Sequence, residues 1–225
     1  MKIQAILPAA GAGERMKSQI PKPLLLLHGK PVIVRTIEVF EACEAVDSII
    51  LVVHPDYRKD YEDVVKKTDF KKTVLIVEGG ETRTQSVRNG LGALDKDTTC
   101  VMIHDGVRPC ITRDVIERGL KEIKDEKALV AAVGVKPTLK VVDPQTRLVT
   151  ETLDRSLVWE IQTPQIFERG LLERAYRKDT EGATDDAALV ERLGVKVKVF
   201  LGDYQNIKIT TPEDMLIAEA FLERK

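Results

Sequence analysis

The sequence has little of what several common protein classes need. Its 225 residues include three cysteines, three histidines and one tryptophan, and 35 Lys plus Arg against 36 Asp plus Glu give a formal net charge of −1. An odd number of cysteines with no CxxC spacing supports neither a disulfide framework nor a zinc ribbon, so we expect Cys43, Cys100 and Cys110 to be buried thiols. The histidines lack HExxH or similar ligand spacing, which disfavours a zinc or non-haem iron enzyme.

Long apolar runs and an excess of one charge are also missing. Charged residues make up 32% of the chain and are of mixed sign, which argues against wrapping nucleic acid and against a polybasic membrane surface. No segment approaches the ~18 apolar residues of a membrane span, and the first apolar run is too short for a signal peptide. We therefore expect a soluble, cytoplasmic protein that binds neither nucleic acid nor membrane, and any polyanion site must be local.

Apolar runs rich in β-branched residues alternate with amphipathic stretches along the first 135 residues. The expected strands are residues 3–7, 48–53, 73–77, 100–104 and 129–135, and the expected helices are residues 31–43, 57–67, 84–94 and 112–124. This order predicts βαβ units and a mainly parallel sheet covered on both faces. A chain of this length can bury one core without staples, so we predict a single doubly wound α/β domain over residues 1–225.

A different pattern follows residue 135. Residues 137–142 and 147–152 flank the turn signal Asp143-Pro144-Gln145-Thr146, which predicts an antiparallel hairpin arm at about residues 137–155. Because a lone hairpin is marginal in water, we expect it to lean on another surface, either a second subunit or its own domain. The chain then returns to helices at 169–178 and 185–193, strands at 195–201 and 206–209, and a last helix whose first residue is Pro212.

The loop after the first expected strand is rich in small residues. It spans residues 8–16, reads PAAGAGERM and leads on to Lys17 and Lys22. Its glycines let backbone N–H groups approach an anion closely, and the composition suits a triphosphate. A dinucleotide-binding turn is disfavoured because the third glycine of GxGxxG and a later ribose-binding acid are missing, and no Gly-Lys-Ser/Thr completes a Walker A motif.

Two further strand ends carry unusual residues. The third strand ends in Gly79 and Gly80, which let the chain pass close to a flat group, although a plain strand-to-helix turn would read the same way. The fourth ends in Asp105, for which two interpretations remain open. Beside a phosphate loop it suits Mg²⁺, and the alternative is a helix N-cap or an ion pair with Arg108.

The ordered series of motifs resembles the 2-C-methyl-D-erythritol 4-phosphate cytidylyltransferase family of the non-mevalonate isoprenoid pathway. The resemblance covers nearly the whole chain and implies a Rossmann-like nucleotidyltransferase fold. Its motifs are residues 8–16, Pro21-Lys22, Gly79-Gly80 with Arg83 and Ser86, His104-Asp105 with Arg108-Pro109, Leu153-Asp154-Arg155, Thr163-Pro164-Gln165 and Asn206-Ile207-Lys208.

The resemblance implies that the phosphate of methylerythritol phosphate attacks the α-phosphorus of CTP and releases pyrophosphate. It assigns catalysis to Arg15, Lys22 and Lys208. It assigns CTP binding to Ala9, Ala10, Gly11, Ala12, Gly13, Arg15, Lys22, Gly79, Gly80, Arg83, Ser86 and Asp105. It assigns Mg²⁺ to Asp105, and acceptor binding to Asp105, Arg108, Thr138, Arg155, Thr163 and Lys208. Thr138 and Arg155 would come from the arm of a partner in a homodimer.

Some features leave the activity open at this point. Gly106 and Val107 stand where the family commonly has two alanines, and Pro137 precedes Thr138 where the family usually has a free N–H. Thr184-Asp185-Asp186 resembles a family segment near the substrate, and a helix N-cap by Thr184 is an equally good interpretation. A cytidylyltransferase for another polyol phosphate, such as ribitol 5-phosphate, is the close alternative. An inactive nucleotide-binding regulatory module is the alternative of another class.

Overall fold

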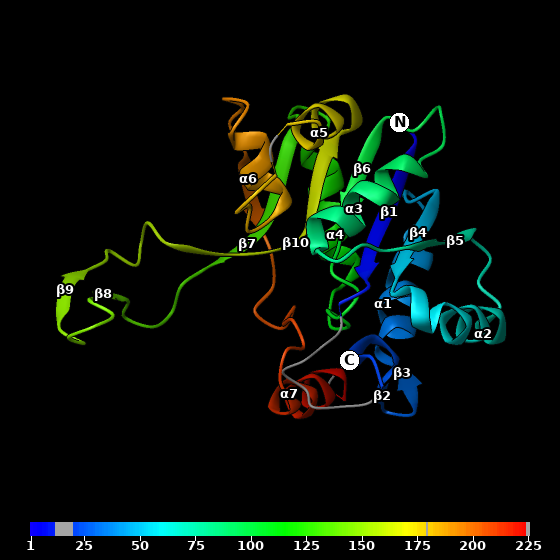
Figure 1. The fold of residues 1–225 in the computed structure, drawn as a ribbon, viewed down its shortest axis with the longest axis horizontal. Helices are drawn as coiled ribbons and strands as arrows, with labels where there is room; N and C mark the ends of the chain where they lie inside the picture. The colour runs from blue at the N-terminus through cyan, green and yellow to red at the C-terminus, as the bar shows by residue number, and fades with distance from the viewer. Residues whose placement is uncertain (12–19, 179, 224–225) are drawn as a thin grey trace.

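A seven-stranded sheet forms the centre of the protein (Figure 1). The computed structural model describes residues 1–11, 20–178 and 180–223. The sheet has the order β11-β7-β10-β6-β1-β4-β5, and β10 runs antiparallel to both of its neighbours while the other pairings are parallel. The strands are β1 (Ile3–Ala9), β4 (Ser48–Val53), β5 (Val74–Glu78), β6 (Cys100–Ile103), β7 (Ala128–Gly134), β10 (Trp159–Glu168) and β11 (Lys198–Leu201).

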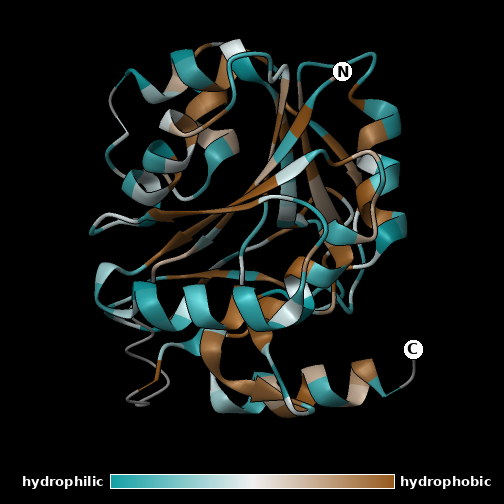
Figure 2. Ribbon diagram, turned by 90° about the vertical axis from the view of Figure 1, so that its right-hand side faces the viewer, coloured by the Kyte–Doolittle hydropathy of each residue, from teal (hydrophilic) through white to brown (hydrophobic). Residues whose placement is uncertain are grey.

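Helices cover both faces of this sheet because its strands are apolar on both sides. Along β4, Ile49, Leu51 and Val53 belong to one buried cluster, whereas Ile50 and Val52 belong to the other. The first cluster includes residues of α1 (Val32–Glu41), α2 (Arg58–Thr68) and α4 (Arg113–Glu122). The second includes residues of α3 (Arg83–Gly92), α5 (Arg169–Tyr176) and α6 (Asp186–Glu191). Figure 2 shows the hydrophobic strands between helices of mixed hydropathy. The predicted doubly wound α/β fold is confirmed.

A third, smaller apolar cluster lies beside α7 (Pro212–Leu222). It joins Ala218 of that helix to Val107, which follows the β6 strand end, and to Ile209 in the segment before the helix. The short strands β2 (Leu26–Leu27) and β3 (Lys30–Pro31) pair with each other, and Leu27 belongs to the same cluster. This packing holds together the residues that follow β6 and the residues that precede α7, next to the strand ends that carry the motifs.

Side-chain caps start several of these helices. The Thr82 hydroxyl accepts a hydrogen bond from the Gln85 amide at 3.1 Å at the start of α3. The last helix begins at Pro212 as predicted, and Thr211 and Asp214 form its capping box. The cap of α6 differs from the one considered above, because the Asp185 carboxylate, and not Thr184, accepts from the Ala188 amide at 2.9 Å.

Two segments in the C-terminal half of the chain differ from the sequence-based expectation. Strand β10 was not predicted, because Pro164 and several polar residues interrupt its apolar pattern, and its register with β7 shifts between Ile161 and Gln165. The strand expected over residues 206–209 does not form. There the Ile209 amide donates to the Val107 carbonyl at 2.9 Å, without the repeated pairing of a ladder.

The predicted hairpin arm is present and stands apart from the central sheet (Figure 1). Strands β8 (Lys140–Val142) and β9 (Val149–Thr152) are antiparallel, and the Asp143 carboxylate accepts from the amides of Gln145 and Thr146 in the turn. Every residue of both strands is exposed, including Val141, Val142 and Val149. The arm therefore has no apolar core within the described part of this chain.

All three cysteine thiols are buried, as predicted. Over the described residues, no helix is both long enough and apolar enough to cross a membrane.

Candidate active site

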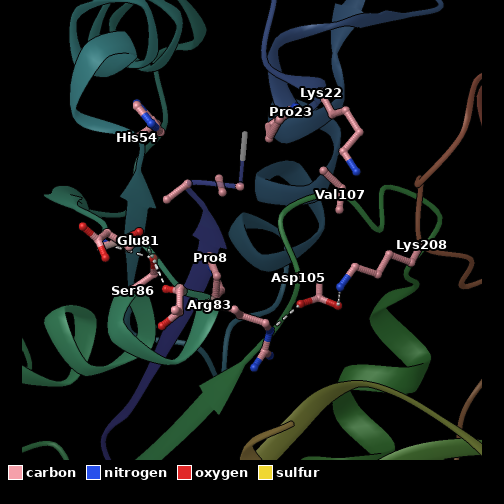
Figure 3. Close-up of a pocket in the computed structure, with 15 residues that line it drawn as sticks. Pro8, Lys22, Pro23, His54, Glu81, Arg83, Ser86, Asp105, Val107 and Lys208 are labelled. Carbon is pink, nitrogen blue, oxygen red and sulfur yellow. Dashed lines mark hydrogen bonds and ion pairs between the residues drawn. The ribbon is translucent and has the colours of Figure 1, made fainter. Parts of the chain in front are cut away.

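The site lies where β1, β5 and β6 end, at the carboxyl edge of the parallel strands. The connection after β1 leads toward β4 on one side of the sheet, and the connection after the neighbouring β6 leads toward β7 on the other side. Open α/β sheets bind their ligands at such a reversal of the strand order. A cleft of about 470 Å³ opens there (Figure 3). Its lining comprises Pro8, Ala9, Ala10, Gly11, Lys22, Pro23, His54, Gly80, Glu81, Thr82, Arg83, Ser86, Asp105, Val107 and Lys208.

Asp105 is the centre of the charge network in this cleft. One carboxylate oxygen, Oδ1, lies 3.2 Å from Nε of Arg83. The other, Oδ2, lies 3.0 Å from Nζ of Lys208 and 3.3 Å from Nε of Arg108. Burial by itself would raise the pKa of the Asp105 carboxyl, but the charges of these three cations hold it well below its usual value. The Asp105 carboxyl group is therefore ionised, and it lies between three positive side chains.

Arg83 is held from two sides. While its Nε faces Asp105, its Nη2 donates to the buried carboxylate of Asp186 at 2.8 Å. The Tyr176 hydroxyl donates to the other oxygen of Asp186. Burial alone would lower the pKa of the Arg83 guanidinium, but the two carboxylates raise it, so the charge is fixed. Single contacts to two separate carboxylates, Asp105 and Asp186, hold the guanidinium along the wall of the cleft.

The turn between β5 and α3 passes very close to the end of β1. A Cβ atom on Gly79 would stand 2.4 Å from Cβ of Ala10 and 2.8 Å from Oγ of Ser86, so the turn requires glycine here. The Gly80 amide donates to Oγ of Ser86 at 3.1 Å, and that buried hydroxyl donates to the Thr82 carbonyl at 3.0 Å. Ser86 thus holds the shape of the glycine pair.

A second cleft of about 280 Å³ adjoins the first. It shares Arg83, Asp105 and Lys208 with the first cleft. Its further lining comprises Arg108, Ile161, Gln162, Thr163, Gln165, Thr184 and Asp185. Two concave spaces therefore meet at one carboxylate and two cations.

Lysine side chains reach this junction from two distant parts of the chain. Lys22 begins the short 3₁₀ helix η2 (Lys22–Leu24), and its Nζ donates to the Ile209 carbonyl at 3.4 Å. Lys208 lies one residue before that carbonyl. In Figure 3 the amines of Lys22 and Lys208 lie on the same side of the cleft as Asp105. The packing of Ile209 against α7 thus supports both lysines.

The site geometry can be compared with known proteins. The family model for 2-C-methyl-D-erythritol 4-phosphate cytidylyltransferase matches residues 3–224. The chain belongs to this family. It is 44% identical over 229 residues to the member from Caldanaerobacter subterraneus subsp. tengcongensis, with the whole of both chains covered. It is 46% identical to the member from Geotalea uraniireducens, covering 99% of this chain and 97% of the relative.

Solved structures of family members have the same fold. The 4-diphosphocytidyl-2C-methyl-D-erythritol synthase of Anaerococcus prevotii superposes with a TM-score of 0.88 at 35% identity, covering 99% of this chain and 96% of that one. The cytidylyltransferase of Thermus thermophilus superposes with a TM-score of 0.78 at 28% identity over the full length of both. The likeness in fold therefore extends over nearly the whole chain.

The residues that the family resemblance assigned to one chain's site are largely brought together. Nine of the assigned residues line the first cleft, namely Ala9, Ala10, Gly11, Lys22, Gly80, Arg83, Ser86, Asp105 and Lys208. Gly79 lies directly behind them, and Arg108 and Thr163 line the second cleft. Ala12, Gly13 and Arg15 lie outside the described residues.

Two assigned residues stand elsewhere. Thr138 and Arg155 lie on the arm and line neither cleft of their own chain, and Nη1 of Arg155 donates to the Lys136 carbonyl at 2.9 Å. Sequence reasoning missed Asp186 and Tyr176 as supports of Arg83, and it did not place His54 at the cleft. The one available signal was that the resemblance places the segment Thr184-Asp185-Asp186 near the substrate.

The departure from the common family pattern at Gly106 and Val107 has a visible packing context. A Cβ on Gly106 would stand 2.9 Å from Cδ1 of Ile33 and 3.2 Å from Cβ of Ala9, so an alanine there would require a neighbouring side chain to shift. Val107 lines the first cleft and also packs against the cluster beside α7. Its added bulk is therefore absorbed in part by the apolar cluster.

The residues available for a divalent cation are few. Over the described residues, no group of three or more His, Cys, Asp or Glu side chains could hold a metal ion. Asp105 lies where the clefts meet, but both of its oxygens already face cations. Mg²⁺ commonly takes one or two carboxylates and completes its shell with substrate phosphates and water. Asp105 fits that use together with a triphosphate.

Proposed function

We propose that this chain transfers the cytidylyl group of CTP to 2-C-methyl-D-erythritol 4-phosphate, forming 4-diphosphocytidyl-2-C-methyl-D-erythritol and pyrophosphate. A phosphate oxygen of the acceptor forms a bond to the α-phosphorus, and the bond to the bridging oxygen breaks as pyrophosphate leaves with its electron pair. The observation that carries the proposal is the junction of the two clefts at Arg83, Asp105 and Lys208. It offers one space for each substrate, with cations between them.

The protein's main task in this reaction is to position two anions and to stabilise the charge that develops between them. The attacking oxygen is already anionic, so no general base is needed. Lys208 borders both clefts, and its amine would contact the acceptor phosphate and the α-phosphate together. Lys22 would stabilise the leaving pyrophosphate from the first cleft. On the family resemblance, Arg15 shares that role.

The first cleft would hold the nucleotide. On the family resemblance, the loop that begins at Ala10 and Gly11 would bind the triphosphate, and the turn at Gly79 and Gly80 would frame the cytosine. Ser86 keeps this turn in place through its bonds to Gly80 and Thr82. Protein groups of this turn that hydrogen-bond to the edge of the base would discriminate against uracil. Uracil has different donors and acceptors and would leave those protein groups unpaired. Arg83 would supply a fixed positive wall between base and phosphates.

Mg²⁺ would be held by Asp105 together with oxygens of the triphosphate. When bound, the ion supplies positive charge to the phosphates and helps to orient them. The carboxylate must then exchange part of its contact with Lys208 or Arg108, both at 3.0–3.3 Å, for contact with the metal. Asp105 would thus be shared between the ion and the cationic walls of both clefts.

The second cleft would hold the acceptor, with Arg108 and Thr163 on its walls. The arm suggests how the cleft is completed. Its strands are wholly exposed and include apolar residues, which favours association with a second copy of this chain. In such a homodimer, Thr138 and Arg155 of one subunit would reach the acceptor phosphate in the site of the other.

A two-acceptor assay tests the proposal. The purified protein is supplied with CTP and Mg²⁺ and with either methylerythritol phosphate or ribitol 5-phosphate, and pyrophosphate release is measured. We expect rapid release with methylerythritol phosphate and little with ribitol 5-phosphate. Preference for ribitol 5-phosphate would overturn the choice of acceptor. CTP binding without turnover of either acceptor would instead support an inactive nucleotide-binding module.

A further inference from the structure

His104 is a buried group at the site for which the proposed reaction has no use. It follows β6 directly, has no exposed surface, and its ring lies 5.1 Å from the ring of Phe40 at an angle of 49°. Both ring nitrogens face uncharged oxygens in a fully buried place, and burial disfavours an unpaired charge, so the imidazole is neutral. A neutral imidazole carries one N–H donor and one acceptor nitrogen.

The partners of His104 determine which nitrogen carries the proton. Its Nε2 lies 3.3 Å from the Arg108 carbonyl oxygen, which can only accept a hydrogen bond. Nε2 must therefore be the protonated nitrogen, and Nδ1 must be an acceptor. Nδ1 lies 3.0 Å from Oγ1 of Thr163. The Thr163 hydroxyl accordingly donates its only proton to His104.

The same hydroxyl also accepts a hydrogen bond. The Asp105 amide donates to Oγ1 of Thr163 at 3.1 Å, and both residues are buried. One lone pair of Oγ1 is all that remains for a ligand. Around this relay, Nδ2 of Asn206 donates to the Thr163 carbonyl at 2.7 Å, and Nη1 of Arg108 donates to the Asn206 carbonyl at 2.8 Å. The network thereby connects both walls of the second cleft.

We infer that His104 is a positioning residue of the acceptor cleft, which fixes the Thr163 hydroxyl so that it cannot donate to the acceptor phosphate. Through Thr163 it sets the backbone of Asp105, and through its Nε2–H it sets the backbone of Arg108. Thr163 can only accept from an acceptor hydroxyl, so the phosphate must find its donors among the cations. Assigning this cleft to the acceptor rests on the proposed function, whereas the hydrogen-bond directions do not.

Histidine NMR tests the hydrogen-bond directions without any substrate. In protein labelled with ¹⁵N-histidine, the His104 signals are assigned by their loss in His104→Gln. At neutral pH we expect a proton on Nε2 and none on Nδ1. Thr163→Val should shift the Nδ1 resonance, and His54→Gln should leave it in place. A proton on Nδ1 would overturn the inference.

Steady-state kinetics with both substrates varied test the positioning role. His104→Gln keeps a donor that can reach the Arg108 carbonyl but gives Thr163 no imidazole acceptor, and Thr163→Val removes the hydroxyl. We expect each change to raise KM for the acceptor roughly tenfold and KM for CTP by less than about twofold. Thr163→Ser should restore wild-type behaviour, and His28→Asn is the matched control, because His28 is exposed and lines neither cleft.

A double-mutant cycle separates the relay from direct contact with the phosphate. If both residues act through one relay, the double variant should be no worse than the worse single variant. Multiplying effects, or equal changes in the KM of both substrates, would contradict the positioning role. If neither polyol phosphate is turned over while the NMR gives the expected proton positions, the proposed function fails and the relay stands.

Discussion

The Asp105 carboxylate lets three positive side chains stand close together in a largely buried place. We predict that Asp105→Asn lowers the free energy of unfolding by about 2 kcal/mol, since Lys208 and Arg108 then face each other without a counter-charge. It should also lower kcat by about a hundredfold or more. Affinity for pyrophosphate alone should rise, because the cleft gains positive charge. Urea unfolding, steady-state kinetics and calorimetric titration measure the three effects.

Asp114→Asn is a suitable control for this change, because Asp114 is an exposed carboxylate in the first turn of α4. It should leave kcat and pyrophosphate affinity unchanged. A wild-type kcat in Asp105→Asn would show that the carboxylate neither holds Mg²⁺ nor organises the cations.

The three cations around Asp105 also set the conditions for metal binding. We predict that Mg²⁺ binds weakly to the protein alone and much more tightly in the presence of CTP, since only the triphosphate outweighs the positive charge of Arg83, Arg108 and Lys208. Titration calorimetry with and without CTP measures the difference, using Mg²⁺ with CTP alone as the blank. Equal affinity in both titrations would contradict the prediction.

His104 makes the stability of the fold depend on pH in a defined window. Its pKa is lowered from 6.5 to about 4 by burial. Between these values the unfolded chain binds a proton that the folded chain does not, so stability falls as pH decreases from about 6.5 to about 4, by up to about 3 kcal/mol. The Asp105 carboxyl, with its lowered pKa, contributes to stability loss only below this window.

We predict that His104→Gln removes most of this pH dependence. Urea unfolding of both proteins at several pH values in the window provides the measurement. His28→Asn is the control, because His28 is exposed and its positive φ of 46° suits asparagine. Parallel curves for the wild type and His104→Gln would mean that another group is responsible.

At the scale of elements, the sequence predicted those whose pattern is local. The β-branched runs of β1, β4 and β6 and the start of α7 at Pro212 depend on neighbours in the chain, and each formed as predicted. Strand β10 depends on pairing with β6 and β7, and Pro164 conceals its pattern. The same difference between local and long-range features holds for the site. The loops at the strand ends were predicted, but the ion pair between Arg83 and Asp186, 103 residues apart, was not.

The turn between β5 and α3 is an element that tolerates little change. We predict that Gly79→Ala destabilises the protein by about 1–3 kcal/mol and weakens CTP binding, because the new methyl group would displace Ala10 or Ser86. Gly92→Ala is the control at the end of α3, where a Cβ would meet nothing within 4 Å. Thermal unfolding and CTP titration of the two variants measure the contrast. Equal behaviour would show that the close approach relaxes without cost.

At the scale of the whole molecule, the near-neutral total charge hides a concentrated positive site. Lys22, Arg83, Arg108 and Lys208 all line the two clefts, against Asp105 at their centre. The exposed arm carries one more candidate cation, Arg155, which lines neither cleft of its own chain. In a site that binds a triphosphate and a phosphate monoester, this additional positive charge would help to neutralise the two anions. This is the physical reason to expect that a complete site needs two copies of the chain.

Subunit mixing tests whether the site is shared. We predict that Lys22→Ala and Arg155→Ala are each poorly active alone, and that mixing equal amounts restores about a quarter of wild-type activity. Half of the mixed dimers would contain both kinds of subunit, and in each of these one site of two is free of both changes. In that site Lys22 comes from the Arg155→Ala chain, and Arg155 comes from the Lys22→Ala chain.

The control mixture is Lys22→Ala with Asp105→Asn, because both changes affect the clefts of their own chain. Every site in that mixture carries one of the two defects, so no activity should return. Native mass spectrometry of subunits with different tags establishes that exchange has occurred. If exchange is complete and Lys22→Ala with Arg155→Ala recovers nothing, then Arg155 does not complete the site of a neighbouring subunit. The exposed arm would in that case have a purely structural role.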